Sequence, residues 1–276
     1  MSWDLVWQTI MIVIGAVNLI IALVIFSRST TWQRAEPGNA AYFTFLRVAG
    51  LIFVAVALYR SIFVTSYPDR LTWFDTPFNS PFVVRCLAVF AELSFIGMIA
   101  AVLLKTISQC TPAGTTRLSG IVTKLPLVAV GCIFLAQFFA FTGLITQYQT
   151  PFAIEESLWA LAFISLTPVV IVGLRRRRLI SKSGRAFLII MAVWCAGYLA
   201  FQCLYALPFM YFANVAQDLG RTVPANALWQ AIFGYTRTRD FDTWGGIGFI
   251  IWHSGYFSLC SVMTLFFMSA PRKRVG

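Results

Sequence analysis

Seven apolar runs, each about as long as a bilayer is thick, constrain this chain more than any other feature. They cover approximately residues 5–26, 41–65, 83–105, 123–146, 157–174, 186–210 and 246–269. A helix needs about 20 mostly apolar residues to cross roughly 30 Å of hydrocarbon. With 59% hydrophobic residues in 276, the chain also has more apolar surface than one soluble core could bury. The sequence therefore predicts an all-α polytopic membrane protein, a single seven-helix bundle over residues 1–276.

The first run is interpreted as a true membrane span. No basic segment precedes it, and no small-residue cleavage site separates it from the second run. A secretory signal peptide normally has both features. An odd number of spans then places the two ends of the chain on opposite sides of the membrane.

The positive charge of the chain is concentrated in alternate connectors. The formal net charge is +11, and most Lys and Arg residues lie in connectors 27–40, 105–124 and 175–185 and in the tail. These residues are Arg28, Arg34, Lys105, Arg117, Lys124, Arg175, Arg176, Arg177, Arg178, Lys182, Arg185, Arg272, Lys273 and Arg274. The positive-inside rule therefore predicts an N-terminus outside and a C-terminus in the cytoplasm. We expect the basic face to contact anionic lipid headgroups, and this placement argues against a nucleic-acid partner.

Polar residues inside the predicted spans are concentrated at one depth. In the predicted orientation the outer half of the bundle contains Arg60, Glu92, Gln137, Glu156, Gln202 and His253. Ionisable side chains at such depth are costly, and they usually pair within the bundle or line a wet cavity. We therefore expect a polar pocket that opens outward between the helices.

Arg85 and Glu92 are the most informative pair for the geometry of such a pocket. They are seven residues apart, so they share one face of the third span at an axial separation of about 10 Å. At that separation we expect no direct pairing, and Arg60 or His253 is the predicted counter-charge for Glu92. The alternative is a structural Arg–Glu bridge that holds the bundle together.

Aromatic and polar side chains of the later spans are expected to complete the pocket. Tyr198, Gln202 and Tyr205 form one stripe at α-helical spacing, and Tyr256 follows His253 by three residues. The connector 211–245 is expected above the pocket, with a short interfacial helix over 224–233. The predicted ligand-binding residues are Arg60, Arg85, Glu92, Gln137, Glu155, Glu156, Tyr198, Gln202, Tyr205, Trp252, His253 and Tyr256.

The titratable residues of this set could support acid–base chemistry. Glu92, Glu156 and His253 are the candidate catalytic residues for cyclisation, isomerisation or hydrolysis of a lipid or isoprenoid. The chain has a single His, and its six Cys show no metal-ligand spacing, so neither a metal nor a cofactor is expected.

Seven spans with an outer N-terminus resemble the topology of heptahelical receptors and rhodopsins. The characteristic residues of those proteins are missing, because the seventh run has Trp252 and His253 but no lysine for a retinal Schiff base. No family is therefore assigned. The favoured function is binding or sensing of a small hydrophobic or amphipathic molecule or lipid. The alternatives are an intramembrane enzyme and a scaffold subunit of a membrane complex.

Overall fold

A computed structural model describes residues 3–28, 37–108, 117–176, 178 and 180–269. Several basic residues behind the predicted orientation, Arg34, Arg177, Arg272, Lys273 and Arg274, lie outside the described residues, as does Cys110. For Arg117 the backbone alone is described.

Within the described residues, seven helical segments are long and apolar enough to cross a membrane. These segments are Trp3–Ser27, Ala40–Ile62, Pro81–Ser108, Gly120–Thr146, Gln149–Arg175, Lys182–Asp218 and Gly246–Ser269. The chain is therefore a multi-pass integral membrane protein with an all-α membrane region, as the apolar runs predict. No membrane is part of the structure, and the sidedness of the two termini stays a prediction.

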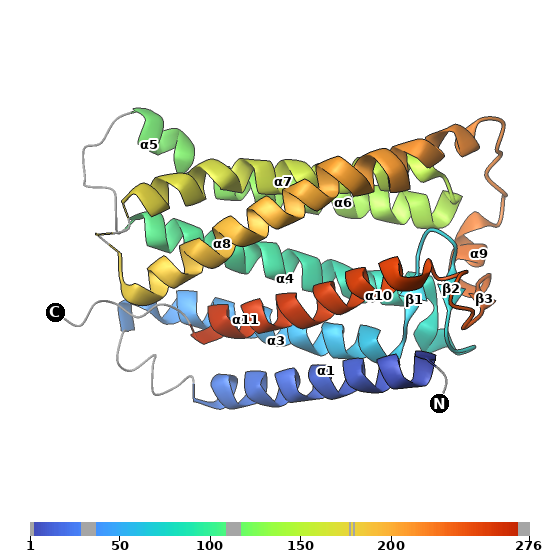
Figure 1. The fold of residues 1–276 in the computed structure, drawn as a ribbon, viewed down its shortest axis with the longest axis horizontal. Helices are drawn as coiled ribbons and strands as arrows, with labels where there is room; N and C mark the ends of the chain where they lie inside the picture. The colour runs from blue at the N-terminus through green and yellow to red at the C-terminus, as the bar shows by residue number, and fades with distance from the viewer. Residues whose placement is uncertain (1–2, 29–36, 109–116, 177, 179, 270–276) are drawn as a thin grey trace. The chain divides into compact units, whose positions relative to one another are not determined.

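Figure 1 shows the order of the elements along the chain. The helices are α1 (Trp3–Ser27), α3 (Ala40–Ile62), α4 (Pro81–Ser108), α5 (Arg117–Val122), α6 (Leu125–Thr146), α7 (Gln149–Arg175), α8 (Lys182–Phe201), α9 (Ala227–Phe233), α10 (Gly246–Ser254) and α11 (Cys260–Ser269). Shorter or non-α turns are η1 (Pro37–Asn39), η2 (Pro77–Asn79), η4 (Gln202–Tyr211), η5 (Phe212–Asp218) and η6 (Gly255–Leu259). The strands are β1 (Thr65–Ser66), β2 (Leu71–Thr72) and β3 (Thr236–Arg237).

The two largest errors in the predicted spans are the end of the sixth, at Asp218 and not at 210, and the start of the fifth, at Gln149 and not at 157. Pro151 marks this start, because a proline is tolerated in the first turn of a helix, where its missing N–H has no intrahelical partner. The Asp218 carboxylate accepts hydrogen bonds from the backbone N–H groups of Gln149 and Thr150, at 2.7 and 2.8 Å. Glu155 and Glu156 therefore do not open α7, and Asp218 supplies the negative charge at its N-terminus.

The chain forms two compact units, which are described separately. Unit 1 consists of residues 1–95, 141–147 and 222–269, and unit 2 of residues 96–140, 148–221 and 270–276. Helices α4 and α6 therefore contribute residues to both units.

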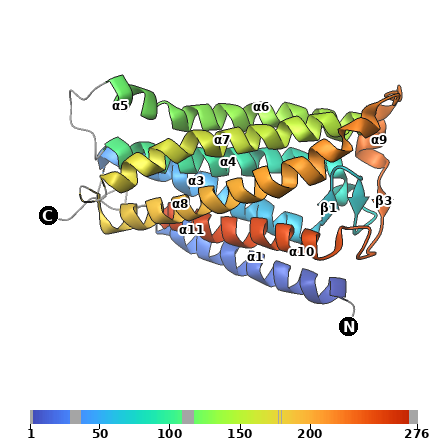
Figure 2. The same ribbon diagram turned by 45° about the horizontal axis from the view of Figure 1, so that its top comes forward.

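In unit 1, α1, α3 and α11 lie side by side (Figures 1 and 2). Small residues permit this packing: a Cβ on Gly15 would meet Leu58 at 3.0 Å, and one on Gly50 would meet Met268 at 2.3 Å. The opposite face of α1 exposes a continuous series of Val, Leu and Ile side chains, as expected for a face that meets lipid.

A small sheet joins two connectors of unit 1, the one between α3 and α4 and the one between α9 and α10. Strands β1 and β2 pair antiparallel, and β3, from the connector before α10, pairs parallel with β2. Asn79 fastens the first connector, since its side-chain amide donates to the Val64 carbonyl (2.9 Å) and the Thr65 hydroxyl (2.7 Å). Trp73 follows β2 and is fully buried. The connector between α3 and α4 is thus an ordered part of the fold.

The predicted interfacial helix corresponds to α9, which is amphipathic. Ala227 and Ala231 are buried, whereas Leu228, Trp229 and Phe233 are exposed. The Ser80 hydroxyl, directly before the first residue of α4, donates to the Ile232 carbonyl at 2.6 Å. Contact of α9 with the bilayer stays a prediction.

In unit 2, α7 packs against α8, η4 and η5. A Cβ on Gly173 of α7 would lie 2.9 Å from the Leu188 side chain of α8, so glycine sets the closeness of these helices. Further along, the Phe163 and Tyr198 rings have centroids 4.6 Å apart.

Candidate functional site

Arg85 and Glu92 form a buried ion pair within α4. The guanidinium donates to both carboxylate oxygens, from Nη1 to Oε1 at 3.0 Å and from Nη2 to Oε2 at 3.3 Å. The expectation that the two residues are too far apart to pair is therefore wrong. That expectation used only the axial separation of the two backbone positions. Side chains on a helix tilt toward its N-terminus, so the Glu92 side chain points toward Arg85, and the long Arg85 side chain spans the remaining distance.

Arg60 lies in the last turn of α3, and no carboxylate of the described residues lies beside it. Its guanidinium carbon lies 4.8 Å from the ring centroid of Phe257, 5.2 Å from that of Tyr67 and 5.9 Å from that of Tyr256. The residue is 4% exposed. Among the described residues, no hydrogen-bond acceptor and no acidic group lies within bonding distance of this guanidinium. The prediction that Arg60 neutralises Glu92 is therefore wrong, because Arg85 does so.

Tyr67 links the two arginines, although the sequence analysis did not select it. Its ring lies 5.2 Å from the guanidinium carbon of Arg60 and 5.5 Å from that of Arg85. Tyr67 belongs to the turn between β1 and β2, so its position depends on how this connector folds back over the ends of α3 and α4. A Tyr in a short turn carries no sequence signal of that placement.

His253 is buried among aromatic rings at the end of α10. Its ring centroid lies 4.3 Å from that of Phe257, 5.0 Å from that of Trp7 and 5.2 Å from that of Phe249. Its Nδ1 atom and the hydroxyl of Tyr256 are both buried, and neither has a hydrogen-bond partner within the described residues. A buried polar atom without a partner is uncommon and calls for an explanation.

Trp252 has a different environment from its neighbour His253. It stacks on Tyr256, with centroids 5.8 Å apart and planes 11° apart, and its outer face is exposed. We name the group of Arg60, Tyr67, Arg85, Glu92, His253, Tyr256 and Phe257 the cationic cluster. Not counting the imidazole of His253, two guanidiniums and one carboxylate give this cluster one net positive charge.

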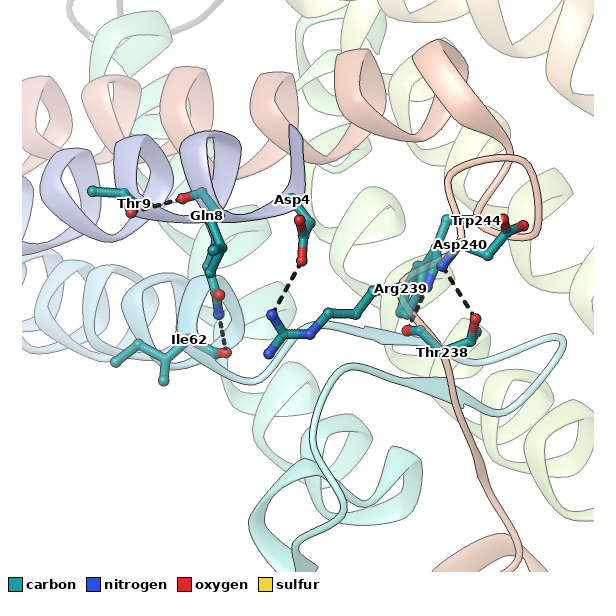
Figure 3. Close-up of polar contacts among 9 residues, drawn as sticks. Asp4, Gln8, Thr9, Ile62, Thr238, Arg239, Asp240 and Trp244 are labelled. Carbon is teal, nitrogen blue, oxygen red and sulfur yellow. Dashed lines mark hydrogen bonds and ion pairs between the residues drawn. The ribbon is translucent and has the colours of Figure 1, made fainter. Parts of the chain in front are cut away.

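Aromatic residues and an ion pair fix the connector of β3 to the start of α1 in unit 1. Arg239 Nη1 lies 3.1 Å from Asp4 Oδ2, and Figure 3 shows this pair beside the hydrogen bond from Gln8 to the Ile62 carbonyl. The Arg239 guanidinium also lies 5.5 Å from the ring centroid of Trp73. Trp73 in turn packs edge-on against Trp7, which contacts His253. The connector that contains β3 therefore packs against the cationic cluster through Trp73 and Trp7.

Unit 2 contains a separate group of predicted site residues around Glu156. Gln202 Nε2 donates to Glu156 Oε2 at 2.7 Å, and the Tyr211 hydroxyl donates to Oε1 at 3.3 Å. Gln202 and Tyr211 are nine residues apart, about two and a half turns of an α-helix, which would place them on opposite faces. They converge because η4 is a π-helix, whose wider i→i+5 turns change the register of the side chains.

The same π-helix disrupts the predicted stripe of Tyr198, Gln202 and Tyr205. Gln202 is buried against Glu156, but Tyr205 is 53% exposed, so the expectation of one continuous wall is wrong. Tyr198 packs on Phe163, and Gln137 donates to the Ile133 carbonyl of its own helix at 2.9 Å. Glu155 is buried. The structure thus gathers the candidates into two groups, one in each unit.

Comparisons with known proteins assign no relative. No protein-family model, no curated protein and no solved structure matches the chain. The chemistry of the two groups is therefore the basis for inferring function.

Proposed function

We propose that this multi-pass membrane protein binds a small amphipathic ligand at the cationic cluster. The observation that supports this proposal is the guanidinium of Arg60. It is 4% exposed and surrounded by rings, and its N–H groups have no acceptor in the part of the chain that the structure describes. A guanidinium has five N–H donors, and aromatic faces stabilise its charge without accepting strong hydrogen bonds from them. A polar group of a ligand would satisfy these donors.

Two further groups favour the same interpretation. The Tyr256 hydroxyl and His253 Nδ1 are also buried without partners, and both belong to the segment that packs against Arg60. Binding sites commonly combine apolar and aromatic walls with a few convergent polar groups. The rings of Tyr67, Tyr256 and Phe257 would contact the apolar part of the ligand next to its polar end.

The predicted orientation completes this proposal. With the N-terminus outside, the C-terminal end of α3 and the N-terminal end of α10 face the outer side, and the ligand enters from the outer leaflet or the outer solution. The basic connectors then contact anionic headgroups at the cytoplasmic face. Accessibility of a cysteine introduced at Ser66 to an impermeant maleimide on intact cells tests this orientation, and labelling only after lysis would reverse it.

Lipid extraction and native mass spectrometry of the purified protein test the binding proposal. We expect the wild type to retain one amphipathic molecule per chain through mild detergent exchange. Arg60→Gln should lose it, because this change removes the charge and most of the donors. The matched control is Arg47→Gln, which alters another buried arginine of the same helix that lies 5.6 Å from the ring centroid of Phe43.

The result is decisive when both variants elute as folded monodisperse protein. Loss of the molecule from the Arg60 variant alone supports the site. Equal retention by the wild type and both variants would show a ligand elsewhere, and a wild type without any retained molecule would contradict the proposal.

The enzymatic and scaffold alternatives stay predictions from the sequence. Glu92 accepts two hydrogen bonds from Arg85, and Glu156 accepts from Gln202 and Tyr211. Both carboxylates therefore already receive donors from the protein itself, whereas the donors of Arg60 have no acceptor among the described residues. This contrast favours binding at the cluster over acid–base chemistry by either glutamate.

A further inference from the structure

We infer that the polar end of the ligand is a single carboxylate, so that the ligand is a hydrophobic monocarboxylic acid. This inference rests on the proposed binding function and specifies its ligand class. It follows from the charge of the cationic cluster, the shape of its free donors and the position of the cluster among membrane-spanning helices.

The charge of the cluster matches one negative charge. Arg85 and Glu92 neutralise each other in a two-point ion pair, at 3.0 and 3.3 Å. The remaining charge is that of Arg60, which α3 contributes from its last turn. The facing segments, η6 and the turn after β1, contribute Tyr256 and Tyr67, and α10 contributes His253. A monoanion therefore leaves the cluster neutral, whereas a neutral or cationic headgroup leaves the guanidinium uncompensated.

The free donors suit a planar acceptor with two oxygens. A guanidinium presents parallel N–H groups that match the two oxygens of a carboxylate, and this geometry is more demanding than a point charge. The Tyr256 hydroxyl has no partner and can donate to one of these oxygens. A phosphate monoester carries close to two negative charges at neutral pH, so one charge would stay buried without compensation.

The surroundings of the cluster indicate that the rest of the ligand is hydrocarbon. Arg60 and the Arg85–Glu92 pair lie within the segments Ala40–Ile62 and Pro81–Ser108, and His253 and Tyr256 lie within Gly246–Ser269. Rings of Phe257, Tyr67 and Tyr256 face the guanidinium. A ligand with a second polar group would place that group among apolar side chains without partners, which is costly.

Four unbranched probes with twelve carbon atoms each test the headgroup. Dodecanoic acid, dodecanol, dodecyl phosphate and dodecylamine are titrated into full-length protein in lipid nanodiscs after removal of copurified lipid, at a pH where the phosphate carries two charges. Binding is followed by the intrinsic fluorescence of Trp7 and Trp252, whose rings lie beside His253. We expect the acid to bind about tenfold or more tightly than each of the others. The alcohol lacks the stronger hydrogen bonds of an ionised acceptor, the amine repels the guanidinium, and the phosphate leaves one negative charge uncompensated.

Variants connect the preference to Arg60. Arg60→Gln should reduce the affinity for the acid to that for dodecanol. Arg60→Lys keeps the charge without the parallel N–H groups, so it should retain part of the difference in affinity between acid and alcohol. The control variant Arg237→Gln changes an exposed arginine of β3 and should leave all four affinities unchanged. The comparison of the four probes on the wild type holds even if an Arg60 variant does not fold.

The outcomes separate this inference from the proposed function. Equal affinity for acid and alcohol, or tighter binding of the phosphate, overturns the carboxylate inference while the binding site stands. A preference for the acid that survives in Arg60→Gln also overturns it. Absence of binding by all four probes overturns both the inference and the proposed site.

Discussion

Two carboxylates of unit 1 and two of unit 2 are accommodated by opposite means. In unit 1, Glu92 and Asp4 each face a guanidinium, from Arg85 and Arg239. In unit 2, Glu156 accepts hydrogen bonds from an amide and a phenol, and Asp218 accepts from two backbone N–H groups and a threonine hydroxyl.

This difference explains why the proposed site lies in unit 1. Neutral donors satisfy the hydrogen bonds of an acid without bringing a positive charge, so Gln202 and Tyr211 offer no cation to an anionic ligand. An acid paired with an arginine leaves any additional arginine in excess, and Arg60 is such a residue. The comparison predicts that removing a negative charge harms unit 1 more than unit 2.

Glu92→Gln is expected to have the largest effect. It leaves the Arg85 guanidinium, 2% exposed, without its counter-charge, and removing one partner of a buried pair costs about 3–5 kcal/mol. Unfolding in mixed micelles with increasing denaturing detergent measures this loss. The double variant Arg85→Met/Glu92→Leu should recover much of the stability, since it removes both charges.

Glu156→Gln is the matched change in unit 2. The new amide keeps an acceptor oxygen for Gln202 or Tyr211, so we expect a loss of about 1 kcal/mol in the same assay. A loss as large as that of Glu92→Gln would break the comparison between the units.

The sequence predicts the spans well and the site only in part. Apolar runs locate helices because the bilayer responds to local composition, and a spacing of seven correctly placed Arg85 and Glu92 on one face. Their pairing was missed because it depends on side-chain length along the helix. The start of α7 at Gln149 was missed because its cap, Asp218, lies far away in the sequence.

The remaining errors come from long-range packing and from helix type. Tyr67 and Phe257 reach Arg60 only after the connectors fold, and no local pattern marks them. The π-helix of η4 was missed because a period of 3.6 was assumed through Pro208, although a proline within a helix removes a backbone donor and favours a different turn. Tyr205 was misplaced for this reason.

Asp218→Ala is expected to have the next largest effect among the carboxylates. It removes the acceptor for the Gln149 and Thr150 N–H groups and for the Thr150 hydroxyl. Loss of a helix N-cap costs about 1–2 kcal/mol, and Asp218→Asn should lose less because its side-chain oxygen still accepts. Stability in the micelle assay orders the three proteins, and an alanine variant as stable as the wild type would show that the cap does not stabilise α7.

The Asp4–Arg239 pair should contribute less, although it is of the same chemical type as Arg85–Glu92. The Arg239 side chain is 30% exposed, and ion pairs accessible to water are worth about 0.2–1 kcal/mol. A double-mutant cycle of Asp4→Asn and Arg239→Gln should give a small coupling that decreases with added salt. A coupling energy that salt does not change would show that Asp4–Arg239 behaves like the buried Arg85–Glu92 pair, and that both of these ion pairs of unit 1 are shielded from solvent.

Asp240 is expected to give the smallest effect, and it tests the rule from inside unit 1. Its carboxylate accepts from the hydroxyl and the backbone N–H of Thr243, at 2.6 and 2.9 Å, so these neutral donors lower its pKa below the ordinary value. A lowered folded-state pKa means that the stabilisation is present above the unfolded pKa, about 3.9, and is lost as the pH falls through the folded pKa.

Thr243→Val removes one donor and should make acid disrupt this turn at a higher pH than in the wild type. The emission of Trp244, obtained as the difference from a Trp244→Phe variant in each background, reports the transition, because its indole N–H donates to the Thr238 carbonyl. Thr236→Val, on exposed β3, is the control. If Thr243→Val and wild type titrate identically, neutral donors do not hold the Asp240 turn, and the claim that neutral donors alone can stabilise a carboxylate loses its simplest example.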